Sequence, residues 1–177
     1  MSLIHRAKID PKAFTQLYEE HVQAVYQYFL IRLHTKSEAE DLTSIVWEAV
    51  LKNISHLNSN KEVVFRAWLF TIARNALNKY FKEKQNQKVV ELDEEKNTFK
   101  SSERSPNELA EENEDAKQIQ ILIEALPSEQ QETLTLRYFS DLKNKEIAKL
   151  LSVSQKTVAS NLSRALKTLR DRWKNLQ

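Results

Sequence analysis

The residues best suited to bind another molecule gather near the C-terminal end of the chain. From residue 156 onward there is one acidic side chain, Asp171, and there are six basic ones: Lys156, Arg164, Lys167, Arg170, Arg172 and Lys174. Lysine and arginine bind the phosphate backbone of nucleic acids, and polar side chains between them can hydrogen bond to base edges. A solvated face on a terminal helix is the simpler alternative for such a charge cluster.

A helix-turn-helix is the element that would position these side chains. Residues 145–151 are short and amphipathic, residues 152–154 form a turn, and residues 155–173 form a long helix capped by Ser154. Apolar residues supply the packing: Ile147, Ala148, Leu151, Val153, Val158 and Leu162. The second helix of such a unit fits the major groove of B-DNA. The pattern therefore predicts DNA binding.

The composition excludes several kinds of catalytic and cofactor site. The 177 residues contain no glycine, so the sequence can contain neither a glycine-rich phosphate-binding loop nor a dinucleotide-binding fingerprint. They contain no cysteine, which removes thiol nucleophiles, disulfides and thiolate zinc sites. The four histidines (His5, His21, His34 and His56) include no pair at metal-ligand spacing. We expect no enzyme activity, no metal and no cofactor.

Glycine content and charge distribution together predict the fold. Tight hairpins depend on the access of glycine to positive φ and helices do not, so the chain is expected to be all-α. The net charge is +4 over residues 1–88, −7 over residues 89–116 and +5 over residues 117–177. The acidic stretch has too few apolar residues to order itself. We predict two small helical domains, 1–88 and 117–177, joined by a flexible acidic linker, 89–116, with the helix-turn-helix in the C-terminal domain.

Local signals predict where the other helices begin. The first starts at Asp10-Pro11, where aspartate can cap and proline can take the first helical position. Capping boxes start a second helix at residues 37–40 and a later one at residues 128–131, and a third helix runs from about Glu62 to Lys84. No apolar run approaches the roughly 20 residues of a membrane span. We expect a cytoplasmic protein without membrane insertion.

Motifs in both halves of the chain resemble those of bacterial sigma factors. The −35-reading domain of that family is similar to residues 125–131 (ALPSEQQ), 136–139 (LRYF), 145–148 (KEIA) and 153–158 (VSQKTV). Residues 39–43 (AEDLT) resemble the segment that docks on the polymerase clamp, and residues 66–75 (RAWLFTIARN) resemble the helix that reads the −10 element. Without a further domain between them, the two halves resemble the extracytoplasmic-function group.

The resemblance implies a role for each half. The N-terminal domain would recognise and melt the −10 element through the loop 58–64 and nearby helices, with contacts from Arg32, Asn58, Ser59, Asn60, Lys61, Arg74, Asn75, Asn78, Lys79 and Lys82. The C-terminal domain would read the −35 element with Arg137, Gln155, Lys156, Thr157, Ser160, Asn161, Ser163 and Arg164. Core RNA polymerase would bind an exposed edge formed by Asp41, Leu42, Ile45 and Glu48, although Leu42 and Ile45 also suit a core.

Some positions depart from the family pattern. Glutamine is frequent at Ser44, aspartate at Asn78, arginine at Lys82 and a basic residue at Ala159. Glycine is usual at Ser152, so its replacement implies a turn that tolerates a β-carbon. Phe65, Trp68, Leu69 and Ile72 lie on one apolar stripe and are interpreted as core rather than as a stacking platform.

Two other functions fit parts of the pattern. A one-component helix-turn-helix regulator would bind operator DNA without core polymerase, usually as a symmetric dimer. A helical protein-interaction module would leave the basic helix unexplained. The resemblance implies core RNA polymerase and promoter DNA as partners, together with an anti-sigma factor, and no homo-oligomer is expected.

Overall fold

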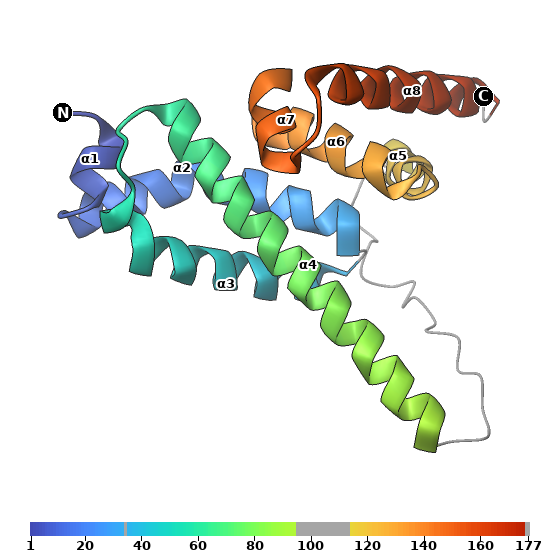
Figure 1. Ribbon diagram of the computed structural model, residues 1–177, viewed down its shortest axis with the longest axis horizontal. Coiled ribbons are helices and arrows are strands. Elements are labelled where there is room, and N and C mark those ends of the chain that lie inside the picture. Colours follow the sequence, from blue (N-terminus) through green and yellow to red (C-terminus); the bar gives the residue numbers. More distant parts are fainter. Residues whose placement is uncertain (34, 95–113, 176–177) are drawn as a thin grey trace.

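The computed structural model describes residues 1–33, 35–94 and 114–175, and within them every regular element is helical (Figure 1). The elements, in chain order, are α1 (Leu3–Ala7), α2 (Pro11–Leu33), α3 (Lys36–Asn53), the 3₁₀ turn η1 (Ile54–His56), α4 (Glu62–Glu94), α5 (Glu114–Glu124), α6 (Ser128–Phe139), α7 (Asn144–Leu151) and α8 (Gln155–Lys174). The predicted all-α fold is confirmed. The linker predicted to be flexible comprised residues 89–116. Its two ends are helical instead, since residues 89–94 belong to α4 and residues 114–116 to α5, and residues 95–113 lie outside the described residues.

The N-terminal domain is built from α1 to α4 around an aromatic core. Asp10 caps α2 as predicted, since its Oδ1 accepts a hydrogen bond from the Lys12 N–H at 2.9 Å. Tyr28 and Phe70 are fully buried and meet edge to face, with ring centroids 5.7 Å apart. The predicted capping box at Ser37 is wrong, because α3 begins at Lys36 and Thr35 flanks it. The short helix α1 was not predicted.

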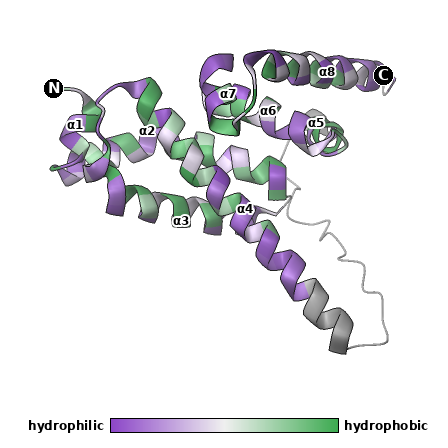
Figure 2. Ribbon diagram, viewed as in Figure 1, coloured by the Kyte–Doolittle hydropathy of each residue, from purple (hydrophilic) through white to green (hydrophobic). Residues whose placement is uncertain are grey.

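Helix α4 continues ten residues beyond the predicted end at Lys84 and takes in the first six residues of the predicted linker. Its second half extends away from the other helices, and the part of that half that Figure 2 colours is mostly hydrophilic (Figures 1 and 2). The Glu38 carboxylate joins α3 to α4: it accepts hydrogen bonds from the Tyr80 hydroxyl and, at 2.7 Å, from Lys84 Nζ. Burial disfavours its ionisation, but hydrogen bonds from Lys84, Thr35 and Tyr80 outweigh it and lower the pKa of Glu38.

The C-terminal domain comprises α5 to α8. Helix α6 begins at Ser128 after Pro127, so Ser128 is the first helical residue and not the predicted cap. Helix α7 begins one residue earlier than predicted, and the Glu146 carboxylate accepts a hydrogen bond from the Lys143 N–H at 3.1 Å. Ser154 caps α8 as predicted, since its Oγ accepts from the Thr157 N–H at 3.0 Å. Val153 was predicted to pack between the helices, but it is exposed.

The turn of the helix-turn-helix is left-handed at Ser152, with φ 57° and ψ 40°. This small allowed region admits a β-carbon only with a steric penalty, which is why glycine is favoured there. The backbone therefore keeps the conformation that glycine favours even though this chain has serine.

Ser152→Gly is expected to raise the free energy of unfolding by about 1 kcal/mol. Glycine removes the left-handed steric penalty of about 1–2 kcal/mol, but it loses more conformational entropy than serine on folding, which offsets part of that gain. Urea denaturation followed by circular dichroism measures the change. The matched control is Ser163→Gly on the exposed surface of α8, where glycine is expected to lower stability by about 0.5–1 kcal/mol. A lower stability for Ser152→Gly would contradict the left-handed turn.

Candidate nucleic-acid interface

The start of α8 forms an exposed polar surface. Gln155, Lys156 and Thr157 are exposed in its first turn, where free backbone N–H groups and the helix dipole favour anions. Ser163 and Arg164, two turns further along the helix, are also exposed. Ser160, which lies between the first turn and these two residues, is half-buried. The structure thus leaves five of the eight predicted −35 residues exposed on the first half of a single helix.

Asn161 and Arg137 lie differently from the other members of that set. Asn161 is 9% exposed on the inner side of α8, so its amide does not lie on the exposed surface of the helix, and its role as a DNA contact stays a prediction. Its neighbours Val158 and Ala165, three before and four after it, are buried on the same helix face. Arg137 is exposed, and its Nη1 donates a hydrogen bond to the Leu142 carbonyl at 2.8 Å.

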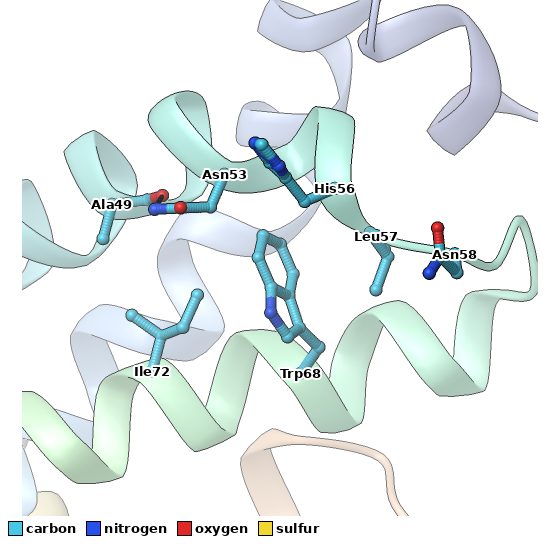
Figure 3. Close-up of a pocket in the computed structure, with 7 residues that line it drawn as sticks. All are labelled: Ala49, Asn53, His56, Leu57, Asn58, Trp68 and Ile72. Atoms are coloured by element: carbon cyan, nitrogen blue, oxygen red, sulfur yellow. Dashed lines mark hydrogen bonds between the residues drawn. The ribbon is translucent and has the colours of Figure 1, made fainter.

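A pocket of about 370 Å³ opens between α3, η1 and the first turns of α4 (Figure 3). Its lining residues are Ala49, Asn53, His56, Leu57, Asn58, Trp68 and Ile72. The Trp68 ring extends from α4 toward η1 across the middle of this space. Trp68 and Ile72 are half-buried, whereas Phe65 and Leu69 are fully buried. The interpretation as core therefore holds for Phe65 and Leu69, while Trp68 and Ile72 form a pocket wall.

The loop beside this pocket carries the predicted residues Asn58, Ser59, Asn60 and Lys61. Lys8, which directly follows α1, holds the loop in place, because its Nζ donates to the Leu57 carbonyl at 2.6 Å and to Asn60 Oδ1 at 3.4 Å. Within the loop, the Lys61 N–H donates to Ser59 Oγ at 3.2 Å. Sequence reasoning missed Lys8, Asn53 and His56. The polar break at residues 56–61 was the available signal for His56, but nothing local linked Lys8 to a loop 49 residues away.

The six predicted −10 residues outside the loop divide between two surfaces. Asn75, Asn78, Lys79 and Lys82 are exposed on α4. Arg74 is instead half-buried, and its Nε lies 2.8 Å from Glu132 Oε1 of α6. Arg32 on α2 is half-buried too. The structure therefore separates the two arginines from the exposed polar face of α4.

Helix α3 presents the predicted polymerase-binding edge with one change. Asp41 and Glu48 are exposed and Ile45 is 53% exposed, which is unusual for isoleucine on a packed helix. Leu42 is 6% exposed and belongs to the core, so its prediction as part of the edge is wrong. Leu51, 60% exposed on the same helix, was not predicted. Two aliphatic side chains among carboxylates suit a protein-binding surface.

Two family models match two separate stretches of this chain. The model of Sigma-70 region 2 matches residues 17–87, and the model of Sigma-70 region 4 matches residues 116–169. The chain belongs to the sigma-70 family, in its extracytoplasmic-function (ECF) group. The first matched region of this ECF chain contains the pocket and most of α4, and the second contains α7 and most of α8, the two helices of the helix-turn-helix.

Relatives of this ECF chain are similar over nearly its whole length. The ECF RNA polymerase sigma factor BldN of Streptomyces coelicolor is 31% identical over 96% of the chain, which spans 64% of that relative. SigM of Bacillus subtilis is 28% identical, with 88% of this chain and 91% of SigM covered. The fold is similar to that of the sigma factor RpoE of Bartonella quintana, solved with the anti-sigma factor NepR: the TM-score is 0.68 at 21% identity, covering 92% of this chain and 98% of RpoE.

Two kinds of feature are absent from the described residues. No helix in the described ranges has the length and apolar character required to cross a membrane. No group of three or more histidine, aspartate or glutamate side chains within those ranges could hold a metal ion.

Proposed function

We propose that this ECF chain directs RNA polymerase to promoters in the cytoplasm. The exposed edge of α3 binds core polymerase, the pocket and the exposed face of α4 take the −10 DNA, and the start of α8 reads the −35 element. The observation that carries the proposal is the presence in one chain of two exposed surfaces of different chemistry. One is a pocket of about 370 Å³ lined by Trp68 and polar side chains, and the other is an exposed polar helix end.

The pocket suits an unstacked base. Opening a duplex requires a place for a base that has left the stack, and an aromatic ring with nearby polar groups stabilises it. Trp68 supplies the ring, and His56, Asn53 and Asn58 supply hydrogen-bonding groups. The Asn53 amide nitrogen already donates to the Ala49 carbonyl at 2.8 Å, so its Oδ1 remains to accept a hydrogen bond. Asn75, Asn78, Lys79 and Lys82 then hold the adjoining strand.

The helix-turn-helix suits duplex DNA. Gln155, Lys156 and Thr157 enter the major groove at the start of α8, with Ser160, Ser163 and Arg164 further along; Arg137 of α6 contacts phosphate. RpoE was solved with an anti-sigma factor, and we propose a protein of that class as a further partner here. A chain of this kind needs no bound cofactor and no catalytic group of its own.

Reconstitution with core RNA polymerase tests the proposal. The purified chain is expected to co-purify with core enzyme and to start run-off transcription at discrete sites on genomic fragments. A chain that binds duplex operator DNA tightly alone, and never associates with core enzyme, is instead a one-component regulator. Association with core enzyme without any transcript would point to an interaction module.

Ile45→Asp is expected to weaken binding to core polymerase at least about 30-fold, because a central apolar contact typically contributes 2 kcal/mol or more. The change should leave the fold intact, since Ile45 is 53% exposed. Fluorescence anisotropy of the labelled chain titrated with core enzyme measures the affinity. The matched control is Ile9→Asp, an isoleucine 78% exposed outside α3, which should bind like wild type. Equal affinity for both variants would remove Ile45 from the docking surface.

A further inference from the structure

Lys8 connects the beginning of the chain to the loop beside the pocket. It is half-buried directly after α1, and its Nζ donates to the Leu57 carbonyl at 2.6 Å and to Asn60 Oδ1 at 3.4 Å. The donor is an ammonium group, so both are charge-assisted hydrogen bonds. The model of Sigma-70 region 2 matches residues 17–87, and Lys8 lies before that stretch. The match therefore assigns no role to Lys8.

The backbone on both sides of Lys8 is fixed. Ile4 of α1 is fully buried in the core of the N-terminal domain. The Arg6 carbonyl accepts hydrogen bonds from the Ile9 N–H at 3.0 Å and from the Asp10 N–H at 2.9 Å. Asp10 in turn caps α2. The Lys8 side chain therefore starts from a turn that packing and hydrogen bonds hold in one place, and its ammonium group can restrain the loop rather than follow it.

Lys8 reaches the pocket through the Leu57 carbonyl. That carbonyl belongs to the peptide unit between Leu57 and Asn58, and both of these residues line the pocket (Figure 3). Because a peptide unit is planar, a hydrogen bond to its oxygen restrains ψ of Leu57 and φ of Asn58 together. The second hydrogen bond, to Asn60, restrains the same loop two residues further on. The orientation of Asn58 at the pocket therefore depends on Lys8.

We propose that Lys8 is a positioning residue that sets the base specificity of the pocket, because it holds the loop 57–61 so that Asn58 presents its amide to the unstacked −10 base in one orientation. The inference rests on the proposed function, in which the pocket receives such a base, and adds a determinant of which base is accepted. An amide held in one orientation distinguishes a donor from an acceptor on the base edge, whereas a freely turning amide pairs with either. Loss of Lys8 therefore reduces discrimination between bases more than it reduces binding of DNA.

Three variants separate this role from a general effect of charge. Lys8→Met removes the ammonium group and keeps an unbranched side chain of similar length. Lys8→Arg is the conservative variant, since it retains a positive charge and several N–H donors. The matched control is Lys12→Met, which removes the same charge from an exposed lysine four residues further along the chain.

The first measurement is amide hydrogen exchange in the free chain, followed by NMR. The Leu57 N–H donates to the Ile54 carbonyl at 3.1 Å and the Lys61 N–H to Ser59 Oγ at 3.2 Å, so both amides report on opening of the loop. Lys8→Met is expected to speed their exchange about 10-fold or more, the factor that corresponds to one hydrogen bond to a charged group. Exchange as slow as in Lys12→Met would overturn the inference.

The second measurement is run-off transcription with core polymerase from templates that carry each of the four bases at every position of the −10 element. Lys8→Met is expected to reduce the preference for the best base over the worst about 10-fold at one position, with binding to the −35 duplex unchanged. Lys8→Arg should recover most of that preference, and Lys12→Met should match wild type. A loss spread evenly over all −10 positions would show a general structural effect and overturn the inference.

The two hypotheses fail in different ways. The absence of transcripts from wild type refutes the proposed function and the inference with it. Transcripts from wild type, together with the same base preference in Lys8→Met and Lys12→Met, refute the role of Lys8 alone.

Discussion

Trp68→Ala is expected to lower promoter opening by the reconstituted polymerase about 10- to 100-fold, because stacking of one base on an aromatic side chain contributes about 1–3 kcal/mol. The Trp68 ring crosses the pocket beside the −10 loop and is the larger of the two rings in its lining, the other being the imidazole of His56 (Figure 3). Without the ring, an unstacked base loses its apolar partner while the polar groups of the pocket remain. Fluorescence of 2-aminopurine placed in the −10 element measures opening directly.

The matched variant for that experiment is Trp68→Phe, which keeps a π face of smaller area and should retain most of the opening. Binding of the polymerase to the −35 duplex provides an internal reference, since it depends on α8 and not on the pocket. Both Trp68 variants should therefore leave it unchanged. Normal opening by Trp68→Ala would show that the pocket does not receive a base.

Arg164→Ala is expected to weaken binding to a −35 duplex about 5- to 150-fold and to relax selectivity at one base pair, which corresponds to the roughly 1–3 kcal/mol of a bidentate contact with guanine. Arg164 is exposed on α8, about 15 Å along the helix axis from Ser154 at 1.5 Å per residue. If α8 enters the major groove with its first turn, as proposed, that distance puts Arg164 beside the bases rather than at the helix tip. A salt titration on a library of −35 variants measures affinity and selectivity together.

Lys156→Ala is the comparison for Arg164→Ala. Lys156 is exposed in the first turn of α8, where it can meet phosphate. Its loss should weaken all sequences about equally and reduce the dependence of affinity on salt. If Arg164→Ala behaves in the same way, Arg164 contacts phosphate as well. If it changes nothing, α8 does not lie in the groove as proposed.

Much of the fold could be predicted from the sequence because helix signals are local. Asp10 and Ser154 are followed by helices that they cap, as predicted, and the residues between carry a helical apolar period. Because the chain has no glycine, helices are the main elements that can satisfy the hydrogen-bonding groups of its backbone. Two sets of motifs in one order also sufficed to recognise the family, since they identify the two matched regions.

Helix ends and faces were less predictable, because they depend on contacts between segments far apart in sequence. Periodicity placed both Leu42 and Ile45 on the same stripe of α3, yet packing buries Leu42 and leaves Ile45 half exposed. Asn161 is polar like its neighbours in the sequence of α8, but its side chain is buried in the interior of the domain. The register of a helix against its neighbours decides such cases, and a local pattern does not contain that register.

The composition and motifs by themselves determined that this chain is helical, that it has two domains and that it carries a DNA-binding helix-turn-helix. Only the tertiary structure decided that Trp68 lines a pocket, that Lys8 holds the loop beside it, and that Arg74 binds Glu132 of the other domain. The contacts of Lys8 and Arg74 join residues 49 and 58 positions apart in the chain, and the pocket includes both Trp68 of α4 and Ala49 of α3. Local sequence fixes the backbone through short-range hydrogen bonds and sterics, whereas a site requires groups that only the packing of distant helices brings together.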